Sequence, residues 1–240
     1  MGVQSSFGFT LGRMEKGRLN KITDVPGVRV GHVTRHEGGI NTGVTAILPH
    51  TGDMFHDKCP AASHVINGFG KSIGLVQVNE LGTIETPLLL TNTLSVGTAA
   101  TALVKYMLER NADIGCDTGT VNPMVFECND GHLNDIRGLH ITEQNALDAL
   151  ANAADDFEEG AVGAGSGMSC YSLKGGIGSA SRVFELYGNK YTVGALLLTN
   201  FGTLRDLTIG GERVGERLYQ KKEAEKAAAE QQDKGSVIII

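Results

Sequence analysis

Short apolar runs rich in β-branched residues recur along this chain of 240 residues and limit the folds open to it. Several are apolar at successive positions, such as ALLL at 195–198, which is typical of strands buried on both faces. With helical patterns between them, the runs predict a layered α/β protein with a mixed sheet. The predicted strands are Val28–Thr34, Gly43–Leu48, Leu75–Val78, Leu88–Thr91, Val121–Phe126, Thr192–Leu198 and Val237–Ile240.

Three segments between or after these runs carry helical patterns. Val96–Arg110 has small and apolar residues at helical spacing, and Ser95 before it is a candidate N-cap. Thr142–Phe157 places one apolar stripe among acidic residues. Arg213–Asp233 is rich in Ala and mixed charge but has little to bury, so we expect a helix that continues as a solvated linker.

Glycine is the one strongly biased residue type, with 33 copies where average usage predicts about 17. It clusters at 160–167 and at 175–178. A dinucleotide-binding loop would need a strand before it and a helix after it. The acidic DDFEEG precedes the first cluster and strand-like sequence follows it, so we favour close backbone crossings over a phosphate site.

Charge and residue inventory exclude several functions. A net charge of −6 argues against nucleic acid as a partner, since such binding usually needs a basic face. No apolar stretch reaches the length of a spanning helix, and the N-terminus lacks the apolar core of a secretory signal, so we expect a cytoplasmic protein with no membrane partner.

The cysteines and histidines predict neither a disulfide framework nor a metal site. No C-x-x-C or H-E-x-x-H occurs. His32 lies on a predicted strand, and in extended chain a residue four positions away, such as His36, is about 13 Å distant. We expect no metal and no cofactor. The four cysteines, predicted to be buried or half-buried free thiols, are Cys59, Cys116, Cys128 and Cys170.

The junction Gly235–Ser236 joins the polar segment to the apolar run VIII at 237–240. A serine hydroxyl can attack its own preceding carbonyl if the chain bends there, and Gly235, without a Cβ, permits that bend. After cleavage, the free α-amino group of Ser236 could act as base for its own hydroxyl. The alternative is an ordinary Gly–Ser turn before a strand.

Seven segments in order point to a family. The sequence resembles the DmpA-like aminopeptidases, which include L-aminopeptidase/D-Ala-esterase/amidases and β-peptidyl aminopeptidases, over nearly the whole chain. The resemblance implies an αββα sandwich similar to N-terminal nucleophile hydrolases and a precursor that cleaves itself before a Ser. The matching segments are ITDVPGVRVGHVT (22–34), GVTAILP (43–49), ETPLLLTNTLSVG (85–97), NDGHLNDI (129–136), GAVGAGSGMSCYSLKGGIGSASRV (160–183), LLLTNFG (196–202) and GSVIII (235–240).

The resemblance assigns roles to individual residues. Ser236 matches the nucleophile that forms an acyl-enzyme, and Asn200 matches the amide that stabilises the oxyanion. Glu127 matches the carboxylate that receives the free amino group of a small peptide, amide or ester substrate. Asn129, the second candidate substrate-binding residue, stands where some members have Tyr, and its N-D-G turn is closer to the β-peptidyl branch. Without the resemblance, we would interpret Asn200 as a turn residue at the end of a strand, and Glu127 as a surface acid beside a turn.

The resemblance also predicts the domain organisation. Residues 1–235 correspond to the large subunit, with 213–235 as helix and linker, and 236–240 begin a small subunit whose remainder lies outside this sequence. That small subunit and further copies of the chain, in a homo-oligomer, are the expected partners. Two alternatives stay open: an acyltransferase of the ornithine acetyltransferase type, which cleaves before Thr, and a non-catalytic binding or scaffold domain.

Overall fold

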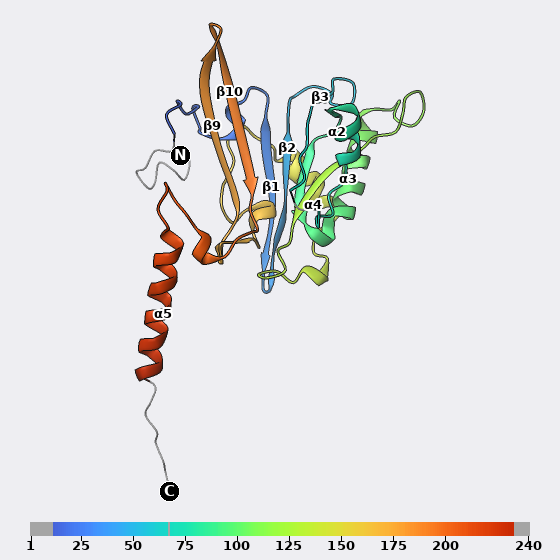
Figure 1. The fold of residues 1–240 in the computed structure, drawn as a ribbon. Coiled ribbons are helices and arrows are strands. Elements are labelled where there is room, and N and C mark those ends of the chain that lie inside the picture. The colour runs from blue at the N-terminus through green and yellow to red at the C-terminus, as the bar shows by residue number, and fades with distance from the viewer. Residues whose placement is uncertain (1–11, 67, 233–240) are drawn as a thin grey trace.

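A four-stranded sheet is the centre of the computed structural model, which describes residues 12–66 and 68–232 (Figure 1). Its strand order is β1 (Arg29–Glu37), β2 (Ile40–Leu48), β5 (Leu88–Asn92) and β6 (Met124–Cys128). β1, β2 and β5 pair antiparallel, whereas β5 and β6 are parallel. A parallel pair needs a crossover, and α3 (Val96–Arg110) provides it.

Helices cover one face of this sheet. α3 and α4 (Glu143–Ala151) bury small and apolar side chains against β2, β5 and β6, in the pattern that helical spacing predicts. Leu89, Val125, Leu103 and Ala146 are fully buried at this interface. This is the main core of the protein.

A long hairpin lies on the opposite face, as Figure 1 shows. It consists of β9 (Ile177–Leu186) and β10 (Asn189–Leu198). Val30, Leu90 and Ile177 form a second buried cluster, against which Leu196 and Leu198 of β10 pack. The described residues therefore stack as helices, sheet and hairpin, which confirms the predicted layered α/β class.

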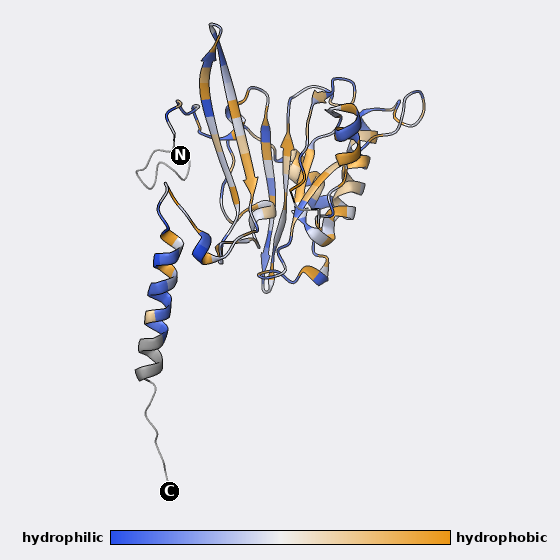
Figure 2. Cartoon of the chain, viewed as in Figure 1, coloured by the Kyte–Doolittle hydropathy of each residue, from blue (hydrophilic) through white to orange (hydrophobic). Residues whose placement is uncertain are grey.

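The remaining elements are short, apart from the last helix. α5 (Val214–Gln232) extends away from the sheet, and most of its residues coloured in Figure 2 are hydrophilic (Figures 1 and 2). Glu216 in its first turn forms an ion pair of 3.0 Å with Arg205 of the short helix η5 (Leu204–Asp206). The short elements are η1 (Ile22–Asp24), β3 (Cys59–Pro60), α2 (Leu75–Leu81), β4 (Thr83–Ile84), η2 (Thr93–Ser95), η3 (Ile136–Gly138), η4 (Gly163–Gly165), β7 (Ser169–Cys170), β8 (Leu173–Lys174) and η5 (Leu204–Asp206).

Three local predictions were wrong. Leu75–Val78 is helical, because Gly74 and Gly82 adopt positive φ at its two ends and the Gly82 N–H caps the carbonyl of Val78 at 3.0 Å. The Ser95 side chain makes no cap hydrogen bond; instead Asn92 accepts from the N–H groups of the next turn. The helix predicted to reach Phe157 ends at Ala151.

Phe157 packs in the second cluster, on the other side of the sheet from α4. The apolar stripe of 142–157 therefore serves two cores, which sequence periodicity alone cannot separate. The strand predicted at Val237–Ile240 lies outside the described residues.

The glycine clusters form close backbone crossings, as predicted. Gly160 exchanges two backbone hydrogen bonds of 2.7 and 2.8 Å with Ile177. A Cβ on Gly176 would overlap the carbonyl oxygen of Gly160, and one on Gly165 would lie 2.6 Å from the Ile177 nitrogen. Only glycine fits where these two segments cross.

The prediction of buried or half-buried free thiols holds for three of the four cysteines. The four cysteines are free thiols, but Cys116 is exposed, whereas the other three are half-buried. Within residues 12–66 and 68–232, no helix is long and apolar enough to cross a bilayer, and no group of three or more His, Cys, Asp or Glu side chains could hold a metal ion.

Candidate active site

The carboxyl ends of the parallel strands β5 and β6 lie side by side, with Thr91 opposite Glu127 and Asn92 opposite Cys128. Side chains that follow such strands converge at one edge of a sheet. The end of β10 reaches the same edge, since the Cys128 thiol lies 3.7 Å from the carbonyl oxygen of Leu198. This edge gathers three of the predicted site residues.

Glu127 is half-buried and held by uncharged donors. One carboxylate oxygen accepts from the Thr93 hydroxyl, and the other accepts from the backbone N–H of Lys71 at 3.1 Å. The Lys71 ammonium turns away to the carbonyl of Phe69 at 2.6 Å. Among the described residues, no Lys or Arg lies within ion-pair distance of Glu127, so its carboxylate is available to a ligand cation.

Glu127 also affects its neighbour. Burial, together with the nearby Glu127 charge, raises the pKa of the Cys128 thiol to about 11. Because the thiolate is the nucleophilic form, Cys128 stays protonated and unreactive near neutral pH.

Asn200 follows β10 and is exposed at the same edge. Its Nδ2 donates a 2.7 Å hydrogen bond to the carbonyl oxygen of Asn129. A side-chain amide has two N–H donors, so this bond fixes the orientation of the group and leaves the second donor free. A fixed neutral donor is what stabilisation of an oxyanion requires.

The side chain of Asn129 is occupied locally. Its Oδ1 accepts from the N–H of Gly131 at 2.9 Å, an Asx turn that reverses the chain after β6. The residue thus contacts Asn200 through its backbone carbonyl, and its amide shapes the turn.

A buried polar network lies beneath this turn. Asp130 is fully buried, and one of its oxygens accepts from Asn134 Nδ2 at 3.0 Å. The other oxygen has no hydrogen-bond partner among the described residues. Asn92 donates to the Thr42 hydroxyl at 2.8 Å, and Asn134 accepts from the Asn41 N–H at 3.0 Å. The network joins the turn to the β1–β2 hairpin.

Burial raises the pKa of Asp130 above its ordinary value. The folded state then binds the Asp130 proton more tightly than the unfolded chain, so the contribution of this carboxyl to stability falls as pH rises above about 4 through the folded pKa. Asp130→Asn cannot ionise and keeps an acceptor for Asn134. We expect the free energy of unfolding of this variant, minus that of the wild type, to increase from pH 4 toward neutrality.

Urea unfolding across pH 4–8 measures this difference. Asp117→Asn is the control, because Asp117 is an exposed acid of the same type. A pH-independent difference for Asp130→Asn, equal to that of the control, would show that the buried carboxyl has an ordinary pKa.

A cleft of about 690 Å³ opens beside Asn200. Lys174 borders both this cleft and a second hollow of about 550 Å³. Its ammonium donates to the carbonyls of Gly165, Met168 and Gly175 at 3.0, 3.2 and 2.7 Å, and burial lowers its pKa. The cleft residues are His132, Leu133, Ser169, Ser172, Leu173, Lys174, Asn200, Phe201 and Gly202.

The structure therefore brings Glu127, Asn129 and Asn200 to one edge of the sheet, with Asn200 lining the cleft. Gly235 and Ser236 lie outside the described residues. The sequence reasoning missed Thr93 and Lys174. The only signal for Thr93 was its place after a predicted strand, within LTNT.

Residues 20–240 match peptidase family S58. The chain belongs to this family. It is 41% identical over 215 residues to the beta-peptidyl aminopeptidase BapA of Sphingosinicella microcystinivorans, an alignment covering 85% of this chain and 53% of that protein. The chain thus spans about half the length of this relative.

Solved structures agree with this placement. The PH0078 protein from Pyrococcus horikoshii is 55% identical with a TM-score of 0.89, covering 91% of this chain and 64% of that one. The L-aminopeptidase D-Ala-esterase/amidase from Ochrobactrum anthropi, described as a prototype serine aminopeptidase and a variant of the Ntn hydrolase fold, is 38% identical with a TM-score of 0.80, covering 87% and 60%. The predicted family and fold are confirmed.

Proposed function

We propose that the protein containing this chain is a self-processing serine aminopeptidase or amidase. It would release N-terminal residues, β-residues among them, from short peptides, amides or esters with a free amino group. One observation carries the substrate class: the Glu127 carboxylate is held by Thr93 and the Lys71 N–H, without a cation, at the sheet edge where Asn200 presents a free amide donor. The names of BapA and of the Ochrobactrum anthropi enzyme support the same activity.

In this proposal the chemistry has two halves. Cleavage of Gly235–Ser236 frees the α-amino group of Ser236, which takes the proton of its own hydroxyl as the oxygen attacks the substrate carbonyl. Asn200 donates to the oxyanion, and the proton passes to the leaving amine or alcohol. Water then releases the acyl group. Glu127 pairs with the substrate ammonium and so places the carbonyl near Ser236.

The proposed partners of this chain are its own small subunit and further copies of itself. Residues 1–235 would be the large subunit, with 236–240 the start of the small one. β10 supports this, since the outer face of the hairpin exposes Tyr191, Val193 and Leu197, apolar surface that a further layer would cover. Exposed Ile66, at 93%, and Val76, at 78%, support a homo-oligomer. The free thiols are in keeping with the cytoplasm.

The substrate class is tested with p-nitroanilides of alanine and β-alanine, free or N-acetylated. We expect the full-length gene product to cleave the free amines and not the acetylated forms. Glu127→Gln removes the charge but keeps the shape, and kcat/KM for the free amines should fall about 30-fold or more, the effect of losing one partner of a partly desolvated ion pair (~2 kcal/mol).

Glu80→Gln is the matched control, because Glu80 is an exposed acid on α2. Its kcat/KM should be unchanged. Equal turnover of free and acetylated substrates, or an unaffected Glu127→Gln, would contradict the proposed role of Glu127.

A further inference from the structure

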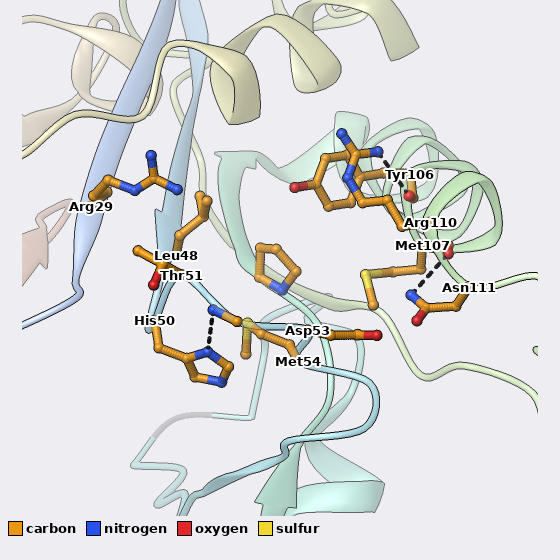
Figure 3. A pocket seen from close by; sticks show the side chains of 12 residues that line it. Arg29, Leu48, His50, Thr51, Asp53, Met54, Tyr106, Met107, Arg110 and Asn111 are labelled. Atoms are coloured by element: carbon orange, nitrogen blue, oxygen red, sulfur yellow. Dashed lines mark hydrogen bonds between the residues drawn. The ribbon is translucent and has the colours of Figure 1, made fainter.

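A separate cavity of about 300 Å³ lies at the other end of the sheet, between the start of β1 and α3 (Figure 3). Arg29 opens β1 and pairs with Leu48 at the end of β2, and Pro87 directly precedes β5. Glu127, by contrast, lies at the far ends of β5 and β6. The cavity is therefore distinct from the candidate active site.

Arg29 is the unusual group in this cavity. Its Nε is buried without a hydrogen-bond partner among the described residues, and no described carboxylate forms an ion pair with its guanidinium. A buried donor left unpaired destabilises the folded state, so a ligand acceptor at this place would be favourable. Figure 3 shows the Arg29 side chain on one side of the cavity and the α3 residues on the other.

The other basic groups of the cavity are already engaged. Arg110 lies 3.5 Å over the Tyr106 ring and donates to the Tyr106 carbonyl at 3.1 Å. His50 Nδ1 accepts from the Gly52 N–H at 3.0 Å, which leaves its Nε2 to donate to Asp57 O at 2.9 Å. Arg29 is thus the one lining cation whose fork of donors is free among the described residues.

The walls determine what kind of anion fits. Leu48, Met54 and Met107 are buried and apolar, at 7%, 4% and 2% exposure. Asp53 also lines the cavity and would repel a second negative charge. One free guanidinium, apolar walls and one nearby acid suit a monoanion with an apolar tail better than a phosphate.

We propose that this cavity is a binding site for a small monocarboxylate with an apolar chain. The carboxylate would take two parallel hydrogen bonds from the Arg29 fork, a geometry that guanidinium groups match well. The chain would lie against Leu48, Met54 and Met107. The site is independent of the peptidase reaction.

Isothermal titration calorimetry of the full-length gene product tests this with acetate, butanoate, 4-methylpentanoate and 4-methylpentanamide. We expect saturable binding of 4-methylpentanoate, with affinity falling about fourfold for each methylene removed. The amide, which lacks the charge, should bind about tenfold more weakly or worse. Equal affinity of the amide, no dependence on chain length, or no saturable heat would overturn the proposal.

Variants locate the site. Arg29→Gln should weaken 4-methylpentanoate binding at least about tenfold. The affinity of Arg29→Lys should lie between those of Arg29→Gln and the wild type, because Lys keeps the charge but lacks the paired N–H donors of a guanidinium. Arg35→Gln is the matched control: Arg35 lies further along β1 and does not line the cavity, so binding should be unchanged. Unaltered binding by Arg29→Gln would overturn the proposal. If that variant does not fold, the affinity of Arg29→Lys and the dependence of wild-type binding on chain length and charge test the proposal instead.

Discussion

Ser236→Ala is expected to leave the full-length product as one uncut chain without measurable hydrolysis of β-alanyl p-nitroanilide. Alanine has no oxygen to attack the Gly235 carbonyl, so the precursor persists, and no nucleophile is exposed. Removal of a serine nucleophile costs on the order of 10⁶-fold in kcat where it has been measured, so the loss should be complete in an ordinary assay. Intact-mass spectrometry and turnover of the purified product measure the two effects.

Two further variants separate processing from catalysis. Ser236→Thr keeps a hydroxyl, so it should still be cut, though more slowly because the β-branched residue restricts χ1. Ser172→Ala removes an exposed hydroxyl that lines the cleft and should be cut like wild type. If Ser236→Ala is cut normally and retains its activity, Ser236 is not the nucleophile and the self-processing proposal is wrong.

The central layers of the fold could be predicted from sequence. The strands around Val44, Leu89 and Val125 have β-branched and apolar residues at successive positions, because helices cover one face of the sheet and the hairpin covers the other. Helix Val96–Arg110 was found with its bounds unchanged, because its small residues recur at helical spacing along the buried side.

Segments decided by tertiary contacts could not be predicted. Leu75–Leu81 is too short for its hydrophobic periodicity to distinguish a helix from a strand. The positive φ angles of Gly74 and Gly82 at its two ends set the bounds of the helix. The contacts of the candidate active site also depend on tertiary structure. Glu127, Asn129 and Asn200 came from the family resemblance, whereas the support that Thr93 gives Glu127 depends on β5 and β6 being neighbours, a pairing that sequence alone did not reveal.

Asn200→Ala should lower kcat about 10²- to 10³-fold with little change in KM, the loss seen when one oxyanion donor is removed. The donor acts on charge that develops in the transition state, so substrate binding is largely unaffected. Asn200→Asp should be worse than Ala, because a carboxylate at this position would repel the oxyanion. Steady-state kinetics with alanyl p-nitroanilide measures both variants.

The alternative to an oxyanion role is that Asn200 only ties its loop to the turn after β6, through the 2.7 Å bond to the Asn129 carbonyl. That bond alone is worth about 1 kcal/mol, so its loss should lower the thermal midpoint by only a few degrees. Asn129→Ala keeps the carbonyl acceptor but removes the side chain that forms the Asx turn, and so loosens the turn without removing the donor. If the amide donor matters, Asn129→Ala should keep a kcat close to that of the wild type, whereas Asn200→Ala, at similar stability, should have a much lower kcat. Equal losses of kcat in the two variants would assign Asn200 a structural role.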